Sequence, residues 1–149
     1  MITITVDTSR FDRKMADLPA RMAAAKKRAL EAIGEAVVSR TTLAFRTPSI
    51  RPLRWEPRKP SKRDDGHPLL IKSGTLRKSF QWRLDGSDAV VVGTDREYAP
   101  YLQFGTKYMP ARPFFPVTQY GRLTPKMEDK IVRTVDRIYK EELGELGKG

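Results

Sequence analysis

The chain has 149 residues, 39% of them hydrophobic and 32% charged, so we expect a single domain over residues 1–149 with a modest core. The absence of cysteine excludes disulfides, thiolate catalysis and cysteine-bound metals, and it fits a reducing cytoplasm. Lys and Arg number 29 against 18 Asp and Glu, a formal charge of +11, so the surface should attract polyanions or acidic protein faces. No apolar run approaches the ~20 residues of a membrane span, so we expect no membrane association.

The N-terminal residues predict a strand followed by a long helix. Apolar and polar residues alternate from Ile2 to Val6, which is the pattern of a strand with one buried face. Ser9 can cap a helix, and apolar residues then recur at three- and four-residue spacing as far as Phe45. Pro19 fits a helix interior badly, so we expect a kink or restart there and a main helix over about 19–45.

Residues 46–68 follow neither period and predict an extended, basic, proline-rich arm. Five prolines interrupt this stretch, and basic residues lie between them. Fully extended, such an arm could reach on the order of 60 Å and embrace a neighbouring subunit. Its candidate contact residues are Arg46, Arg51, Arg54, Trp55, Arg58, Lys59, Lys62 and Arg63. The alternative is a solvated surface loop that contacts no partner.

A helical turn and a hairpin follow the arm. Ser73 to Ser79 has the composition of a short capped helical turn. Alternation in residues 80–84 and a β-branched run in residues 89–93 predict two strands, and the Asp-Gly-Ser-Asp sequence of residues 85–88 is typical of a tight turn between them. The two strands should therefore pair in an antiparallel hairpin.

Residues 94–104 predict a short helix that ends at Gly105. Tyr98, Tyr101 and Phe104 recur within it at helical spacing. Aromatic residues on a short helix belong either to the core or to an interface with another chain. Both alternatives stay open for these three side chains.

The last third of the chain predicts a stiff segment and a second helix. Prolines hold residues 109–116 in an extended conformation, so this segment loses little entropy when it docks. Phe114 and Phe115 can therefore pack either in the core or against a neighbour. A helix with one apolar stripe is expected over about 125–144, with Thr124 as its cap.

No group of residues predicts catalysis, a cofactor or a metal. His67 is the single histidine, so one chain cannot supply a histidine pair or a two-histidine metal site. Asp64 and Asp65 are read as turn formers, because adjacent loop residues rarely converge on a cation. The other carboxylate pairs fall on positions that should be exposed. We therefore expect a protein that is not an enzyme.

Two motifs resemble a known family. They are Val92-Gly-Thr-Asp-Arg-Glu-Tyr-Ala-Pro-Tyr-Leu-Gln-Phe-Gly-Thr106 and, close behind it, Pro110-Ala-Arg-Pro-Phe114. Both are similar to the virion morphogenesis and tail completion families of tailed phages, including the Mu-like group, although that group often has histidine where this chain has Leu102. Upstream, Trp55-Glu-Pro57 and Ser73-Gly-Thr-Leu-Arg-Lys-Ser79 resemble the aromatic arm and helical turn of the same family. The resemblance implies a protein that finishes the tail or joins it to the head, typically as a ring matched to the tail tube.

Together these expectations predict one fold, one role and one set of partners. The fold should be α+β, with a small, mostly antiparallel sheet of residues 2–6, 80–84 and 89–93 packed with the two helices. The resemblance implies a structural bacteriophage protein of the neck or tail end, a tail terminator or connector ring component that resides in the virion. Its partners would be copies of itself, in a sixfold or alternatively a twelvefold ring, and other neck, tail tube or connector proteins.

DNA would pass through such a ring without sequence-specific binding. The contact set comprises the arm residues named above together with Tyr98, Tyr101, Phe104, Arg112, Phe114 and Phe115. The competing interpretation is a DNA-binding accessory protein of the phage that clamps duplex without sequence preference. A small phage-encoded enzyme is a third and weaker alternative.

Overall fold

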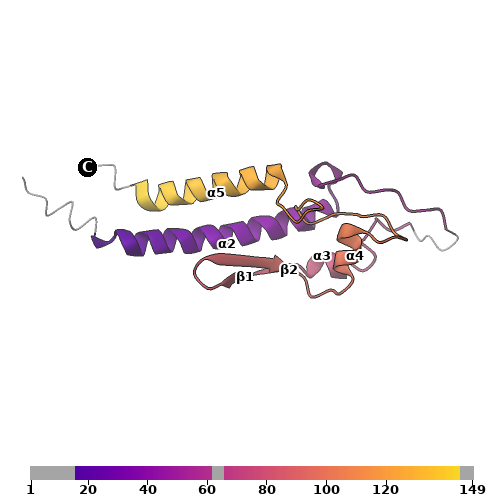
Figure 1. Ribbon diagram of the computed structural model, residues 1–149, viewed down its shortest axis with the longest axis horizontal. Coiled ribbons are helices and arrows are strands. Elements are labelled where there is room, and N and C mark those ends of the chain that lie inside the picture. The colour runs from indigo at the N-terminus through magenta and orange to yellow at the C-terminus, as the bar shows by residue number, and fades with distance from the viewer. Residues whose placement is uncertain (1–15, 62–65, 145–149) are drawn as a thin grey trace, which may run out of the picture.

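Helix α2 (Leu18–Ala44) forms the middle of three layers (Figure 1). Helix α5 (Pro125–Leu143) packs along one side of it, and the hairpin of β1 (Gln81–Asp85) and β2 (Ala89–Gly93) packs along the other. The structure is a computed structural model that describes residues 16–61 and 66–144. The expected α+β class, with a long N-terminal helix, a C-terminal helix and an antiparallel sheet, is confirmed.

Three short helical elements gather at one end of α2. They are the 3-10 turn η1 (Pro48–Ile50) and the helices α3 (Thr75–Lys78) and α4 (Ala99–Phe104). The first described residues of α2 and the last residues of α5 lie at the opposite end of the elongated molecule (Figure 1). The molecule therefore has a helical end and a loop-rich end.

Helix α2 starts close to the residue that the sequence predicts. Pro19 lies in its first turn, where the missing backbone N–H of a proline costs no hydrogen bond. Gly34 allows the hairpin to pack unusually close, because a Cβ built there would lie 2.7 Å from atoms of the Trp82 indole. The absence of a side chain at this position therefore sets the spacing between helix and hairpin.

Helix α5 runs antiparallel to α2 and buries Met127 and Ile138 from its predicted apolar stripe. At the helical end, the Arg28 guanidinium pairs with Glu141 and Glu142, each at 2.7 Å. Hydrogen bonds from Arg137 and from Arg28 hold the pKa of the Glu141 carboxyl below its ordinary value. The ion pair between Arg28 and Glu141 is therefore complete at neutral pH and is lost as the pH falls through the lowered pKa of Glu141.

The hairpin pairs as predicted, with β1 beginning one residue later than expected. Its antiparallel register runs from Gln81 opposite Gly93 to Asp85 opposite Ala89. Alternate residues of β1 are half-buried against α2 and the others are exposed, and β2 follows the same alternation as far as Val92. The expected third strand, residues 2–6, lies outside the described residues, so within residues 16–61 and 66–144 the sheet has two strands.

An aromatic core closes the loop-rich end. The Phe45 ring, just after α2, stacks on Phe114 at a centroid distance of 5.2 Å and meets the edge of Trp55 at 6.0 Å. Phe80 lies 5.4 Å from Phe114 and completes the cluster. Trp55, Phe80 and Phe114, from three other segments of the chain, thus meet around Phe45.

Candidate assembly surface

A buried glutamine fastens helix α4 to the segment that follows it. The Gln103 side chain is 7% exposed, and its Oε1 accepts hydrogen bonds from the backbone N–H groups of Phe114 and Phe115, both at 3.0 Å. Its Nε2 donates to the Phe115 carbonyl at 3.4 Å. The backbone adds a bond of 2.8 Å from the Arg112 N–H to the Leu102 carbonyl. Helix α4 is therefore held as a rigid platform.

Gly105 ends α4 in a position that only glycine can occupy. Its φ is +73°, and a Cβ built there would lie 2.7 Å from the Ala111 nitrogen and 2.9 Å from the Met109 carbonyl oxygen. The sequence predicts the end of the helix but not this close backbone approach. The role of Gln103 is not predicted from the sequence either. The one signal that could have revealed it is that Gln103 is a polar residue within an otherwise apolar helix.

The aromatic side chains of α4 point away from the platform. Because α4 buries Ala99 and Gln103, its opposite side turns Tyr101 and Phe104 outward, with exposed fractions of 58% and 55%, and Tyr98, the residue just before the helix, is 45% exposed. Of the two alternatives for these residues, the core is therefore wrong. A cluster of exposed aromatic rings is typical of a surface that another protein covers. We call Tyr98, Tyr101 and Phe104 the α4 aromatic face.

Two other candidate contact residues lie inside the subunit. Trp55 is 4% exposed and Phe114 is 2% exposed, and the Trp55 indole N–H donates to the Pro113 carbonyl at 2.8 Å. Phe115 is half-buried and packs against the same core. The burial of Trp55 and Phe114 within their own chain removes both from the surface, and the expectation that they meet a partner is corrected.

The first part of the predicted arm is also fixed to its own subunit. The Arg51 Nε donates to the Ala44 carbonyl at 2.6 Å, and the guanidinium lies 3.7 Å above the Trp55 ring. Burial lowers the pKa of Arg51 from its ordinary value, although an arginine in this setting stays charged. Arg51 thus caps the end of α2 and supports Trp55.

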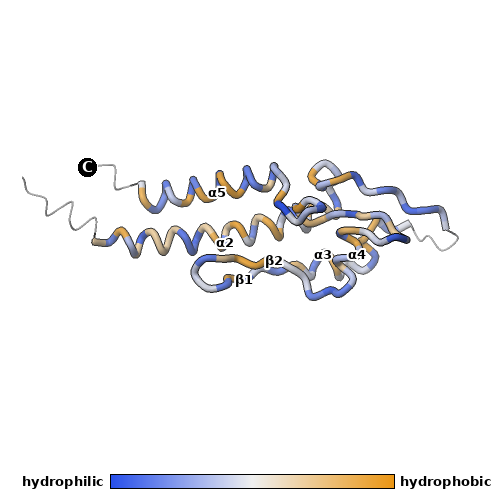
Figure 2. The backbone as a smooth tube through the Cα atoms, in the orientation of Figure 1, coloured by the Kyte–Doolittle hydropathy of each residue, from blue (hydrophilic) through white to orange (hydrophobic). Residues whose placement is uncertain are grey.

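The remaining arm residues divide between anchored and exposed. Arg58 donates to the His67 carbonyl at 3.1 Å, and the Arg112 Nε donates to the Glu56 carbonyl at 3.2 Å. Leu69, Leu70 and Ile71 then pack against the core. Arg46, Arg54 and Lys59 are exposed, and Lys62 and Arg63 lie outside the described residues. The described residues of this stretch, 46–61 and 66–68, are therefore anchored to their own subunit at both ends, and Figure 2 shows that their outer part is hydrophilic.

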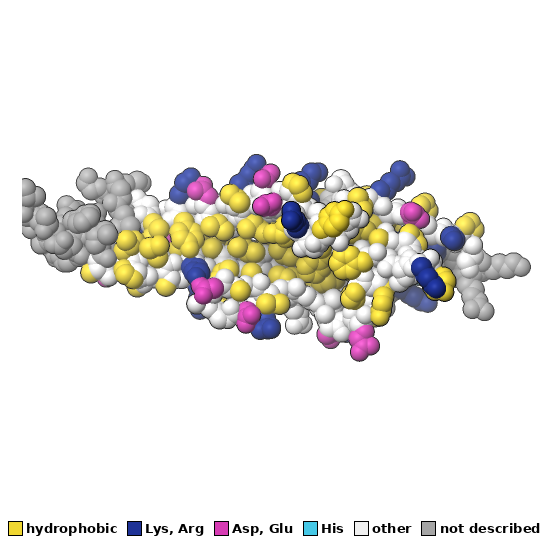
Figure 3. Space-filling view, viewed as in Figure 1, with side chains coloured by type: hydrophobic (Ala, Val, Ile, Leu, Met, Phe, Trp, Pro, Cys, Tyr) yellow, Lys and Arg dark blue, Asp and Glu magenta, His cyan; other side chains and the backbone are white. Residues whose placement is uncertain are grey.

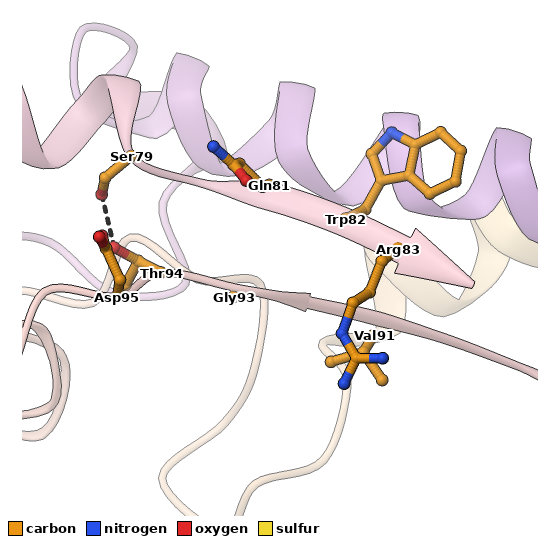
Figure 4. A pocket seen from close by; sticks show the side chains of 8 residues that line it. All are labelled: Ser79, Gln81, Trp82, Arg83, Val91, Gly93, Thr94 and Asp95. Atoms are coloured by element: carbon orange, nitrogen blue, oxygen red, sulfur yellow. Dashed lines mark hydrogen bonds between the residues drawn. The ribbon is translucent and has the colours of Figure 1, made fainter. Parts of the chain in front are cut away.

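Two depressions lie on the described surface. One, of about 390 Å³, lies beside the hairpin, where Figure 4 shows Trp82 turned toward α2 and Arg83 turned away from it. The Ser79 and Thr94 hydroxyls there are 2.5 Å apart and bond to each other, and the Asp95 side chain lines the depression beside them. The second, of about 370 Å³, lies between α4 and the loop after the arm.

The described part of the chain offers neither a metal site nor a membrane-spanning helix. No three acidic, histidine or cysteine residues of residues 16–61 and 66–144 lie close enough together to hold a metal ion. Asp64 and Asp65 lie outside those residues, and His67 Nδ1 lies 3.1 Å from an Arg58 nitrogen. None of the described helices is long and apolar enough to cross a membrane.

Comparison with known protein families identifies the family of this chain. A model of the phage virion morphogenesis family matches residues 6–136, which include the whole α4 platform and most of α5. The chain belongs to the phage virion morphogenesis family. Neither the curated proteins nor the solved structures that were searched contain a match.

Membership of this family indicates the general role of the chain. Proteins of the phage virion morphogenesis family serve the assembly of phage particles, so this chain has a structural or assembly role in a bacteriophage. The resemblance of its central motifs to that family is confirmed. Those motifs contain Gln103 and Gly105, and their geometry explains the motif physically, since both residues hold α4 so that its aromatic side chains face outward.

Proposed function

We propose that this virion morphogenesis protein acts at the neck or tail end of the phage, in tail completion or head–tail joining. It would serve there as a tail terminator or as a component of a connector ring. The observation that carries the proposal is the α4 aromatic face, which is displayed on a platform fixed by Gln103 and Gly105. A surface that is rigid before it binds loses little entropy when a partner docks.

Contact between copies of the chain is the use that this surface suits best. Aromatic side chains commonly supply the central anchors of protein interfaces. A stable interface needs about 800 Å² from each partner, which is more than α4 alone can provide. Further apolar side chains are available, since Met22 and Val132 are 46% and 61% exposed and Figure 3 shows hydrophobic side chains along α2 between α5 and the hairpin.

The subunits would close into a homo-oligomeric ring, with sixfold symmetry expected and twelvefold as the alternative. Other neck, tail tube or connector proteins would be its further partners. The protein would act through shape and adhesion, without catalysis or a cofactor. The positive charge of the chain is compatible with DNA that passes through the ring, and binding to DNA is not needed for that role.

Deletion of the gene tests the proposed function directly. We expect phage without this protein to accumulate unjoined heads and tails, or tails of uncontrolled length, in electron micrographs of lysates. Complementation with the wild-type gene should restore joined particles. Complementation with Phe104→Glu should not, because a carboxylate in the middle of an apolar contact lacks a partner.

The matched control is Tyr120→Glu, since Tyr120 is 81% exposed but lies outside α4. This variant should complement as well as wild type. Normal particles in the deletion mutant, with a defect in DNA replication instead, would favour the accessory protein over the neck protein. Tight, salt-sensitive binding of random duplex by the purified protein would point the same way.

A labelling experiment tests whether the α4 aromatic face is covered in the particle. The chain has no cysteine, so Tyr101→Cys introduces a single thiol. We expect maleimide to modify this thiol readily in the free protein and at least about tenfold more slowly in assembled particles, because a protein contact excludes water and reagent. Tyr120→Cys serves as the control. Equal labelling of Tyr101→Cys in both states would show that the face is not an interface.

A further inference from the structure

The second depression is a cleft with an apolar floor and a cationic rim. It lies between α4, the segment from Met109 to Arg112 and the loop before α3, and its volume is about 370 Å³. Leu76, Leu102 and Met109 contribute to the floor. Clefts of this size hold a few side chains of a ligand, and apolar walls favour aliphatic ones.

All the charged side chains that line the cleft are basic. Arg58, Lys72 and Arg112 reach it, and no aspartate or glutamate does among the described residues. Lys72 is exposed, and within residues 16–61 and 66–144 it forms no ion pair or side-chain hydrogen bond. A ligand that fills this cleft would desolvate cations, so it must bring negative charge with it.

The backbone of the cleft wall is strained. Leu70 has a φ of +61°, and it is the single non-glycine residue with positive φ in the described chain. A residue with a Cβ is disfavoured in this region, and such strain is concentrated at sites that bind ligands. The strain at Leu70 is therefore a second, independent feature of a binding site.

We propose that this cleft docks an acidic segment of another virion protein, an extended stretch in which carboxylates flank one or two leucine-like side chains. The carboxylates would pair with Lys72 and Arg112 at the rim while the aliphatic side chains cover the floor. Tyr98 lines the cleft and also belongs to the α4 aromatic face, so the two surfaces are continuous. The proposal rests on the proposed function and adds the chemistry of the partner.

Nucleic acid fits the same cleft less well. Phosphates could pair with the basic rim, but a duplex backbone carries no aliphatic group to cover Leu76, Leu102 and Met109. The apolar floor would then stay hydrated and contribute nothing to affinity. The combination of basic rim and apolar floor favours a peptide.

Peptide titration of the full-length protein tests this inference. The probe is a fluorescein-labelled acetyl-Asp-Glu-Leu-Asp-Leu-Glu amide, compared by fluorescence anisotropy with versions in which the leucines become serine or the acids become amides. We expect the parent peptide to bind at least about tenfold more tightly than either version. Lys72→Glu should weaken its binding by at least about tenfold through lost and reversed charge.

Lys130→Glu is the matched control, because it makes the same charge change on the exposed side of α5. Equal weakening by Lys130→Glu would mean that only net charge attracts the peptide, and the inference would be wrong. No binding at about 1 mM peptide would overturn it as well, as would displacement of the peptide by random duplex DNA from the Lys72-dependent site. None of these outcomes changes the result of the gene deletion, so the proposal for the cleft and the proposal of a neck function can be refuted independently.

Discussion

Gly105→Ala should destabilise the protein by about 2–5 kcal/mol. About 1–2 kcal/mol comes from forcing a residue with a Cβ to a φ of +73°. The rest comes from the collision of that Cβ with the Ala111 nitrogen and the Met109 carbonyl oxygen, which cannot move aside because both belong to the backbone. Urea unfolding followed by circular dichroism measures the loss as a lower midpoint.

Substitutions at two other glycines distinguish the conformational cost from the cost of the collision. Gly86 and Gly121 have φ values of +64° and +75°, but a Cβ at either would meet nothing within 4 Å. Gly86→Ala and Gly121→Ala should therefore lose only the conformational part, about 1–2 kcal/mol. If Gly105→Ala lost no more than these two, the close approach of residues 105 and 111 would not exist in solution.

Gln103→Leu should cost about 2–4 kcal/mol of unfolding free energy. Leucine has nearly the volume of glutamine, but it leaves the N–H groups of Phe114 and Phe115 without an acceptor in a buried setting. Each buried donor that loses its partner costs about 1–3 kcal/mol. The variant should also unfasten α4, so that the amides of residues 114 and 115 exchange hydrogen faster in the native protein.

Gln119→Leu provides the comparison, because Gln119 is exposed and forms no side-chain hydrogen bond among the described residues. Its stability should stay within about 0.5 kcal/mol of wild type. Unchanged amide exchange in Gln103→Leu, together with wild-type stability, would show that the Gln103 side chain does not hold α4 to residues 114 and 115.

Most regular elements of this fold are readable from local sequence, but the helix predicted over residues 94–104 begins only at Ala99, because the Thr94 hydroxyl accepts the Arg96 N–H in a turn before it. The apolar period from Leu18 to Phe45, the proline at the start of α2 and the glycine-containing turn after β1 each act within a few residues, so they predict helix and hairpin bounds to within one or two positions. The orientation of α4 was harder to predict. It has six residues and apolar side chains on both faces, so its periodicity does not reveal which face is buried.

The errors in the contact set come from interactions between distant parts of the chain. Trp55 lies among prolines and basic residues, as a surface arm would, but its indole bonds to Pro113, which is 58 residues away. Gln103 was not among the predicted contact residues, and its partners Phe114 and Phe115 likewise lie beyond a proline-rich turn, 11 and 12 residues away. Local composition predicts that a segment is extended, but it does not predict what that segment packs against.

The anchored loop limits how far this end of the molecule can extend. Trp55 and Leu69 are both packed against the core, so the chain between them starts and ends there. At about 3.3 Å per residue, half of that stretch spans on the order of 20 Å, a third of the length that a free tether would give. Such a loop can touch only a molecule seated directly beside it, and its basic side chains act on next neighbours rather than across a wider assembly.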